Sequence, residues 1–220
     1  MSDPALTPAI TAALRANELG AASPYRISFA CKGSSGASFG AFQGDTAVNP
    51  AALATLRRVL AAAAMPTDQA GRILDAVRLP CPTDPLSRAD EAAVNAALDA
   101  PQGRALVDAL DQRSLSVVLA DLDLANAAAA RGGNSIDPAG QLAICLWCNM
   151  SGPPTLLLTW LGGVPVTESG AVVAAPGRPV KLDDIRRYLN CTPFFTAHPN
   201  NMAHFLQSVA AGAALLPTPG

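Results

Sequence analysis

The first apolar pattern along the chain has helical spacing. Apolar residues recur at every fourth position, in the row Leu6, Ile10 and Leu14. Glu18 is the next member of this row, and Gly20 is a residue suited to ending a helix. Residues four apart share one face of an α-helix, so a helix is predicted over residues 4–19 with Glu18 at the edge of its buried face.

The next segment alternates between apolar and polar residues, which is typical of β-strands. Tyr25, Ile27 and Phe29 fall on one face, and the residues between them fall on the other. A Gly/Ser-rich turn follows, and a second strand-like run covers residues 38–43. The pattern predicts a two-stranded hairpin, in which the many glycines would let a ligand approach the backbone.

From Pro50 onward the pattern is helical almost throughout, and capping residues mark several helix starts. The predicted helices cover residues 50–64, 67–78, the segment after Ser87, 102–131 with a possible break near 114–116, 138–149, 154–161, 181–190 and 200–215. A second small hairpin is predicted within residues 162–179. Because strands do not alternate with helices, a doubly wound α/β fold is excluded.

These elements predict an α+β fold, a mostly helical domain with a small N-terminal β-hairpin region. The chain has 220 residues, enough for one compact core, and no internal repeat or strong linker divides it. We expect a single domain over residues 1–220. Its first helix and hairpin would form one lobe over about residues 1–49, and a helical lobe would cover about residues 50–216.

Composition and charge narrow the classes of partner. The formal net charge is −2, so the chain offers no basic field for nucleic acid and no polybasic patch for a membrane surface. No apolar run is long enough to span a membrane. The first residues lack the basic and apolar regions of a signal peptide. Nothing in the sequence identifies a protein partner.

Five cysteines are scattered along the chain: Cys31, Cys81, Cys145, Cys148 and Cys191. An odd, scattered set does not form the pattern of a disulfide framework, so buried reduced thiols are predicted. Cys145 and Cys148 have CxxC spacing, but no second pair or nearby histidine completes a zinc site, and we expect no metal. A redox or metal role is the alternative. Reduced thiols favour a cytoplasmic origin unless a leader was removed, and the location stays open.

The order of helix, glutamate, Gly/Ser-rich hairpin and helical remainder resembles that of the lysozyme-like superfamily. This superfamily includes goose-type and phage-type lysozymes, lytic transglycosylases and chitosanases. Residues 35–43, SGASFGAFQ, resemble the segment after the catalytic Glu in goose-type and transglycosylase members. Residues 146–152 resemble the late core helix of phage-type endolysins. Gly44-Asp45-Thr46 departs from the goose-type pattern, where an apolar residue and a proline are commoner.

The resemblance implies a lysozyme-like fold that cleaves a polysaccharide, by default a cell-wall glycan, without a cofactor. It assigns the general acid to Glu18. Such an acid must stay neutral near the working pH, which partial burial at a helix C-terminus promotes. Asp45 is the candidate second carboxylate across a glycan groove. The alternatives are an ordinary surface glutamate and, for Asp45, a turn residue that accepts hydrogen bonds from backbone amides.

Five polar residues are candidates to bind sugar hydroxyls: Tyr25, Ser38, Gln43, Asn149 and His204. Each also has a structural interpretation. Tyr25 suits a half-buried aromatic position, and Ser38 and Gln43 suit a polar strand face. Asn149 suits a helix C-terminus, and His204 suits a packed helix face.

Three other functions stay open. A polysaccharide lyase acting on a uronic-acid glycan would use Tyr25 or His204 as its base. A non-catalytic glycan-binding or interaction protein fits the aromatic content of only 5%, because sugar clefts usually carry aromatic platforms. A serine hydrolase is suggested by Gly36-Ala-Ser38-Phe-Gly40, which matches G-x-S-x-G. That motif needs a helix directly after it, whereas strand-like sequence continues to Gln43.

Overall fold

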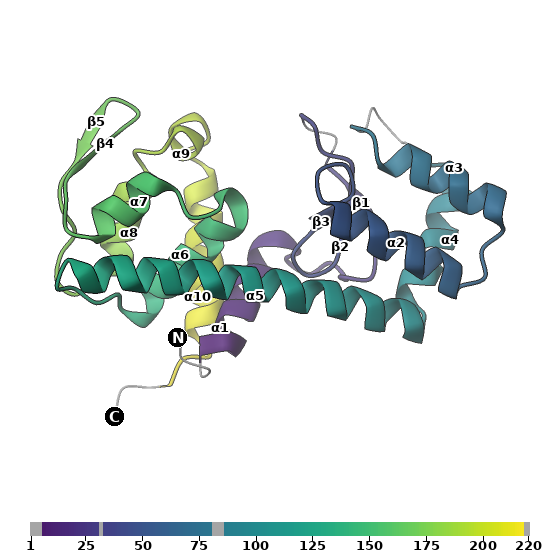
Figure 1. Ribbon diagram of the computed structural model, residues 1–220, viewed down its shortest axis with the longest axis horizontal. Helices are drawn as coiled ribbons and strands as arrows, with labels where there is room; N and C mark the ends of the chain where they lie inside the picture. The colour runs from purple at the N-terminus through teal and green to yellow at the C-terminus, as the bar shows by residue number, and fades with distance from the viewer. Residues whose placement is uncertain (1–5, 31–32, 81–85, 218–220) are drawn as a thin grey trace. The chain divides into compact units, whose positions relative to one another are not determined.

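The computed structural model of the chain describes residues 6–30, 33–80 and 86–217. Helices dominate it and two small antiparallel sheets accompany them, so the predicted α+β class is confirmed (Figure 1). The helices are α1 (Thr7–Glu18), α2 (Pro50–Ala62), α3 (Thr67–Val77), α4 (Arg88–Asp99), α5 (Pro101–Arg131), α6 (Pro138–Ser151), α7 (Thr155–Leu161), α8 (Leu182–Leu189), α9 (Pro193–Ala197) and α10 (Asn201–Ala213). The strands are β1 (Ser28–Phe29), β2 (Ala37–Phe39), β3 (Gly44–Asp45), β4 (Val166–Glu168) and β5 (Ala171–Val173).

The chain divides into two compact units. Unit 1 comprises residues 1–17 and 115–220, and unit 2 comprises residues 18–114. This division differs from the two predicted lobes, because most of α1 groups with the C-terminal helices. α5 continues through the boundary, so the predicted break near residues 114–116 is absent. Serine costs a helix interior only a fraction of a kcal/mol, roughly 0.5, and the neighbouring leucines and alanines favour the helix.

Polar side chains begin several helices where the sequence predicts it. The Asn49 side chain accepts hydrogen bonds from the amides of Ala51 and Ala52 at the start of α2. Ser87 and Asp137 cap α4 and α6 in the same way. Each cap satisfies backbone amides that the first helical turn leaves without a partner.

The N-terminal sheet of unit 2 has the order β1-β2-β3, with both pairs antiparallel. The prediction of one second strand over residues 38–43 was wrong. β2 ends at Phe39, and residues 40–43 form a turn into β3. Gly40 and Gln43 have φ angles of +83° and +48°, which lie outside the β region and end the strand.

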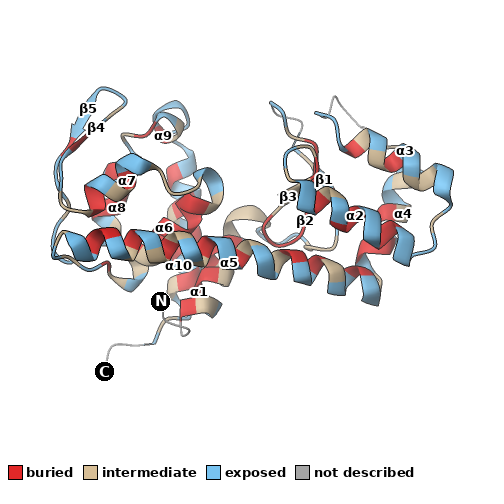
Figure 2. Ribbon diagram, viewed as in Figure 1, coloured by how far each residue is buried: buried red, intermediate tan, exposed pale blue. Residues whose placement is uncertain are grey.

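The core of unit 2 lies between this sheet and the helices that follow it, and the ribbon of its buried residues is coloured red in Figure 2. Its fully buried members include Phe39, Leu56, Leu60, Ile73 and Leu98. The first part of α5 contributes Val107 and Leu110. The short strands therefore contribute to a continuous apolar core made mostly by helices, which is what holds so small a sheet in place.

Unit 1 is built around α6. Residues 142–148 of this helix are all buried, and α10 and α8 pack against it (Figure 2). The predicted second hairpin is confirmed as β4 and β5, whereas the short helix α9 was not predicted. No helix in the described part of the chain is both long and apolar enough to cross a membrane.

The cysteines that the structure describes are free thiols. Cys145 and Cys148 are buried in α6, and Cys191 is half-buried. Burial raises the pKa of Cys145 well above its ordinary value and raises the pKa of Cys148 to about 12, so both stay protonated at neutral pH. The prediction of buried thiols is confirmed for Cys145 and Cys148, Cys191 is free but half-buried, and Cys31 and Cys81 lie outside the described residues.

Gly40→Ala should destabilise unit 2. A side chain would have to adopt the φ of +83°, and its Cβ would lie 2.6 Å from the Oδ1 atom of Asp111. We expect a loss of about 1–3 kcal/mol in the free energy of unfolding, measured by urea denaturation. Gly71→Ala in α3 is the control, because a Cβ there meets nothing within 4 Å and alanine favours the helix by roughly 0.5–1 kcal/mol. Equal stability of the two variants would contradict this view of the turn.

Candidate functional site

Glu18 is the last residue of α1 and is half-buried. The chain turns directly after it. Gly20 has a φ of +54°, and the amide of Ala22 donates to the carbonyl of Leu19 at 2.9 Å. The predicted helix-ending role of Gly20 is confirmed by this left-handed conformation. The turn leads the chain away from the helix axis immediately after the candidate acid.

A groove of about 800 Å³ begins at this turn, within unit 2. Its walls come from the segment before β1 and from one face of α4. The lining residues are Ala21, Ala22, Ser23, Arg26, Ala92, Asn95, Ala96 and Asp99. Three peptide bonds separate Glu18 from Ala21, so their Cα atoms are at most about 11 Å apart. The candidate acid and the rim of the groove are therefore neighbours along the backbone.

The side chain of Asn95 fixes one wall of the groove. Its Oδ1 atom accepts a hydrogen bond from the amide of Ile27 at 2.8 Å. Ile27 is buried in the core and Arg26 is exposed, as the alternating pattern predicts. The hydrogen bond thus joins α4 to the segment that leads into β1.

The turn of residues 40–43 is hydrogen-bonded to α5. The Asp111 carboxylate accepts from the amide of Ala41 at 2.8 Å and from that of Phe42 at 3.4 Å. The close approach of Gly40 to Asp111 leaves no room for a Cβ atom. Hydrogen bonds from backbone amides to an ionised carboxylate are charge-assisted and therefore stronger than those between neutral groups.

Tyr25 contacts the same face of α5. Its hydroxyl donates to Oδ1 of Asp108 at 2.8 Å, and the guanidinium of Arg104 lies over its ring, 4.9 Å from the centroid. The hydrogen bond to Asp108, with burial and the charge of that carboxylate, raises the pKa of Tyr25 above 10.0. Tyr25 therefore stays protonated at neutral pH.

Asp45 is surrounded by hydrogen-bond donors of its own loop. Its carboxylate accepts from the Ser35 hydroxyl and from the amides of Gly36, Ala47 and Val48 at distances up to 3.4 Å. This is the arrangement of a carboxylate that stabilises a turn. The predicted catalytic role of Asp45 stays a prediction, and the hydrogen bonds favour the turn role.

Gln43 and Ser38 also take part in contacts within the sheet region. The Gln43 amide accepts from Ser28 at 2.8 Å and donates to the carbonyl of Gly40 at 3.1 Å. Ser38 is buried in the middle strand, and a turn and a strand follow it instead of the helix that a nucleophile elbow needs. These contacts orient both side chains toward the protein.

The other two predicted sugar-binding residues belong to unit 1. Asn149 is half-buried near the end of α6. His204 is exposed on α10, and its Nε2 atom lies 3.0 Å from the carbonyl oxygen of Asn17. Asn149 lies near a helix C-terminus as its alternative interpretation describes, whereas His204 is exposed and not packed, and the contact of either residue with a sugar stays a prediction.

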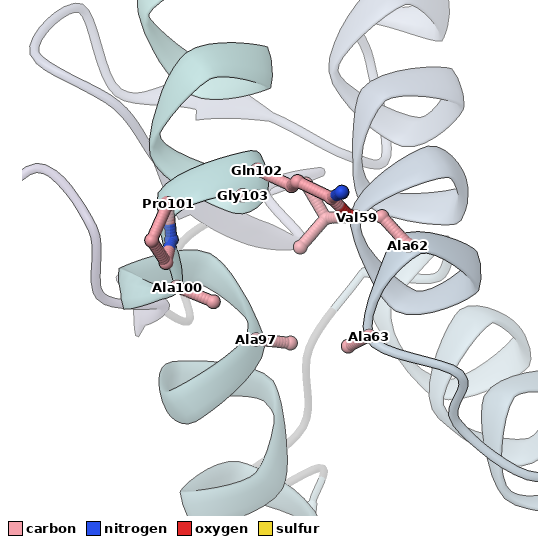
Figure 3. A pocket seen from close by; sticks show the side chains of 8 residues that line it. All are labelled: Val59, Ala62, Ala63, Ala97, Ala100, Pro101, Gln102 and Gly103. Atoms are coloured by element: carbon pink, nitrogen blue, oxygen red, sulfur yellow. The ribbon is translucent and has the colours of Figure 1, made fainter.

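A second, smaller pocket of about 300 Å³ is apolar and lies where α2, α4 and α5 meet (Figure 3). Val59 and alanines of α2 and α4 form its walls, and Gln102 contributes a polar side chain at one side. Within residues 6–30, 33–80 and 86–217, no three His, Cys, Asp or Glu side chains converge to hold a metal ion.

The sequence analysis missed Asn95, Asp108 and Asp111. Arg104, Asp108 and Asp111 recur at helical spacing, so they share one face of a predicted helix, and this periodicity was the available signal. Asn95 carries no such signal, because its function depends on the backbone of Ile27, far away in the sequence. Comparisons of the chain with protein-family models, curated proteins and solved structures find no match.

Asp45→Ala should destabilise the protein, because the amides of Gly36 and Ala47 lose their acceptor. We expect a loss of about 1–3 kcal/mol in the free energy of unfolding, measured by urea denaturation. Asp75→Ala is the control, since Asp75 is exposed and forms a surface ion pair with Arg78, and a change of about 0.5 kcal/mol or less is expected. Unchanged stability of Asp45→Ala would contradict the turn role.

The pair of Tyr25 and Asp108 should give the stability a pH dependence. The pKa of Tyr25 is raised in the folded state. The contribution of the pair to the free energy of unfolding is therefore complete below the pKa of the unfolded state, near 10.0. It is lost as the pH rises through the pKa of the folded state. The difference in unfolding free energy between the unchanged protein and Asp108→Asn should therefore shrink over that pH range. Asp108→Asn should also lower the pKa of Tyr25, measured by ultraviolet titration of phenolate in a Tyr188→Phe background. An unchanged tyrosine titration would refute the interaction.

Proposed function

We propose that the protein is a polysaccharide-cleaving glycoside hydrolase in which Glu18 is the general acid. One observation carries this proposal: a half-buried glutamate ends α1, and an open groove begins three residues later. An open groove suits an extended chain such as a glycan. A carboxyl group beside the groove suits proton transfer to a glycosidic oxygen.

In the proposed reaction, the Glu18 carboxyl gives its proton to the glycosidic oxygen. The bond between the anomeric carbon and that oxygen breaks, and its electron pair stays on the oxygen. Water then adds to the anomeric carbon, and the proton that it loses restores the carboxyl group. The step uses only water as co-reactant and needs no cofactor.

The identity of the second carboxylate remains open in this proposal. Asp45 is the candidate from the sequence, and its hydrogen bonds assign it to the Ser35–Val48 loop. The proposal therefore depends on Glu18 alone and does not require Asp45 to contact the substrate.

The hydrogen bond of Tyr25 argues against a lyase in which Tyr25 is the base, and a lyase with His204 as its base stays an alternative. A lyase base must lose its proton near the working pH, whereas the hydrogen bond to Asp108 raises the pKa of Tyr25. The phenol is thus held in the state that cannot accept a proton from a uronic acid.

Glu18→Gln should remove cleavage while leaving the fold intact. A panel of purified polysaccharides is incubated with the protein, and new reducing ends are counted. A general acid contributes about 100- to 10,000-fold, so the variant should lose at least about 100-fold. Glu91→Gln, an exposed glutamate of α4, is the matched control and should retain full activity.

Other outcomes of this assay would overturn the proposal. Products that absorb as unsaturated uronates would indicate a lyase. Activity that survives Glu18→Gln but is lost in Ser38→Ala would indicate a serine hydrolase. Binding of a glycan without turnover would indicate a non-catalytic binding protein.

A further inference from the structure

Unit 1 contains a groove that the proposed hydrolase does not use. Its volume is about 390 Å³, and it lies beside β5, in the hairpin labelled β4 and β5 in Figure 1. One side of this β5 groove is formed by residues 172–174. The other side comes from the end of α8 and includes Arg187 and Asn190. The buried ring of Trp160 also lines the groove and gives it apolar surface.

The hairpin directs one pair of residues away from its own hydrogen bonds. Its turn at residues 169–170 has φ angles of +49° and +82°, and Glu168 pairs with Ala171 across it. In such a two-residue hairpin the pair next to the turn exchanges both backbone hydrogen bonds. The following pair, Thr167 and Val172, therefore points its N–H and C=O groups outward, each residue toward a free edge of the sheet.

The free edge of β5 faces the β5 groove. Ala174 lies two residues beyond Val172, so its carbonyl points to the same side, and this carbonyl accepts a hydrogen bond from Nε1 of Trp160 at 2.7 Å. Trp160 and Val172 both line the groove. No hydrogen bond among the described residues engages the outward N–H and C=O groups of Val172. β5 also contains no charged residue or proline, which are the residues that commonly keep a free edge unpaired.

An extended peptide backbone is the ligand that matches this edge. A donor and an acceptor on one strand residue pair with the acceptor and donor of a neighbouring strand. Because the groove has a second side, it accepts a strand whose other edge is free, and it excludes a strand that already belongs to the sheet of a second copy. Asn190 is exposed on that second side, and its amide can both donate to and accept from the outer edge of the peptide.

We propose that the β5 groove binds an extended peptide segment of a partner protein as a third strand of the β4–β5 sheet. The peptide backbone pairs with Val172. Side chains alternate along a strand, so every second residue of the peptide faces the groove, and an apolar side chain there lies against Trp160. This inference is independent of the proposed hydrolase, because it uses no residue of unit 2.

Binding is measured by NMR titration of the full chain with four blocked pentapeptides of the pattern Thr-Xaa-Thr-Xaa-Thr, in which Xaa is alanine, valine, leucine or phenylalanine. At least one peptide should bind saturably. It should slow the hydrogen exchange of the Val172 amide by about tenfold or more, because that amide gains an acceptor. The same peptide methylated at every backbone nitrogen cannot donate a hydrogen bond and should not bind.

Val172→Pro removes the outward N–H and leaves the hydrogen bonds of the hairpin in place, so it should weaken binding about tenfold. Thr167→Pro is the matched control. It removes the equivalent N–H from the opposite edge, which does not line the β5 groove, and it should keep the affinity. Val172→Thr keeps the N–H and should also keep the affinity.

The inference would be overturned if none of the four peptides bound saturably, or if Thr167→Pro weakened binding as much as Val172→Pro. An unchanged exchange rate of the Val172 amide in the bound state would also overturn it. Self-association of the chain that Val172→Pro abolishes, without peptide binding, would assign the edge to a second copy instead. Cleavage of a glycan bears on none of these results, so the two proposals fail separately.

Discussion

The hydrogen bonds from the turn of residues 40–43 to the Asp111 carboxylate are the constraint on which the N-terminal part of unit 2 depends. Strands of two or three residues have too few ladder hydrogen bonds to hold a sheet by themselves. Asp111 and Asp108 stand three residues apart on α5, so they face the same way and hold two separate points of the sheet region. Gly40 is required because any side chain would displace the carboxylate.

These contacts also leave few polar side chains of the sheet region available for a ligand. Asp45 and Gln43 use their hydrogen-bonding capacity for the loop and turn that they occupy. The sheet region therefore acts as a support whose polar side chains stabilise its own structure. The face of α4, in contrast, carries the half-buried Asn95, which lines the groove and whose Oδ1 atom accepts from the amide of Ile27. The proposed binding site of unit 2 is therefore the groove beside the sheet region and not the sheet region itself.

The parts of the fold that local signals encode were predictable. Asn49, Ser87 and Asp137 mark helix starts because a capping side chain satisfies amides only two or three residues away. The run 38–43 was misread because its apolar content resembles a strand, while the φ angles of Gly40 and Gln43 depend on a partner in α5. The grouping of α1 with the C-terminal helices depends on contacts such as Gly212 against Ala9, which no local pattern reveals. The position of Glu18 at a helix end was predictable, and the groove beside it was not.

Glu18 departs from a local rule for helix ends. A glutamate at a helix C-terminus opposes the helix dipole at a cost of about 0.3–1 kcal/mol when exposed, and Glu18 occupies that position. Departures of this kind concentrate at functional sites, because selection there acts on the ligand and not on the fold. Glu18 begins the short segment from residue 18 to residue 26, which also supplies one rim of the groove. The proposal of Glu18 as the acid depends on this closeness along the backbone.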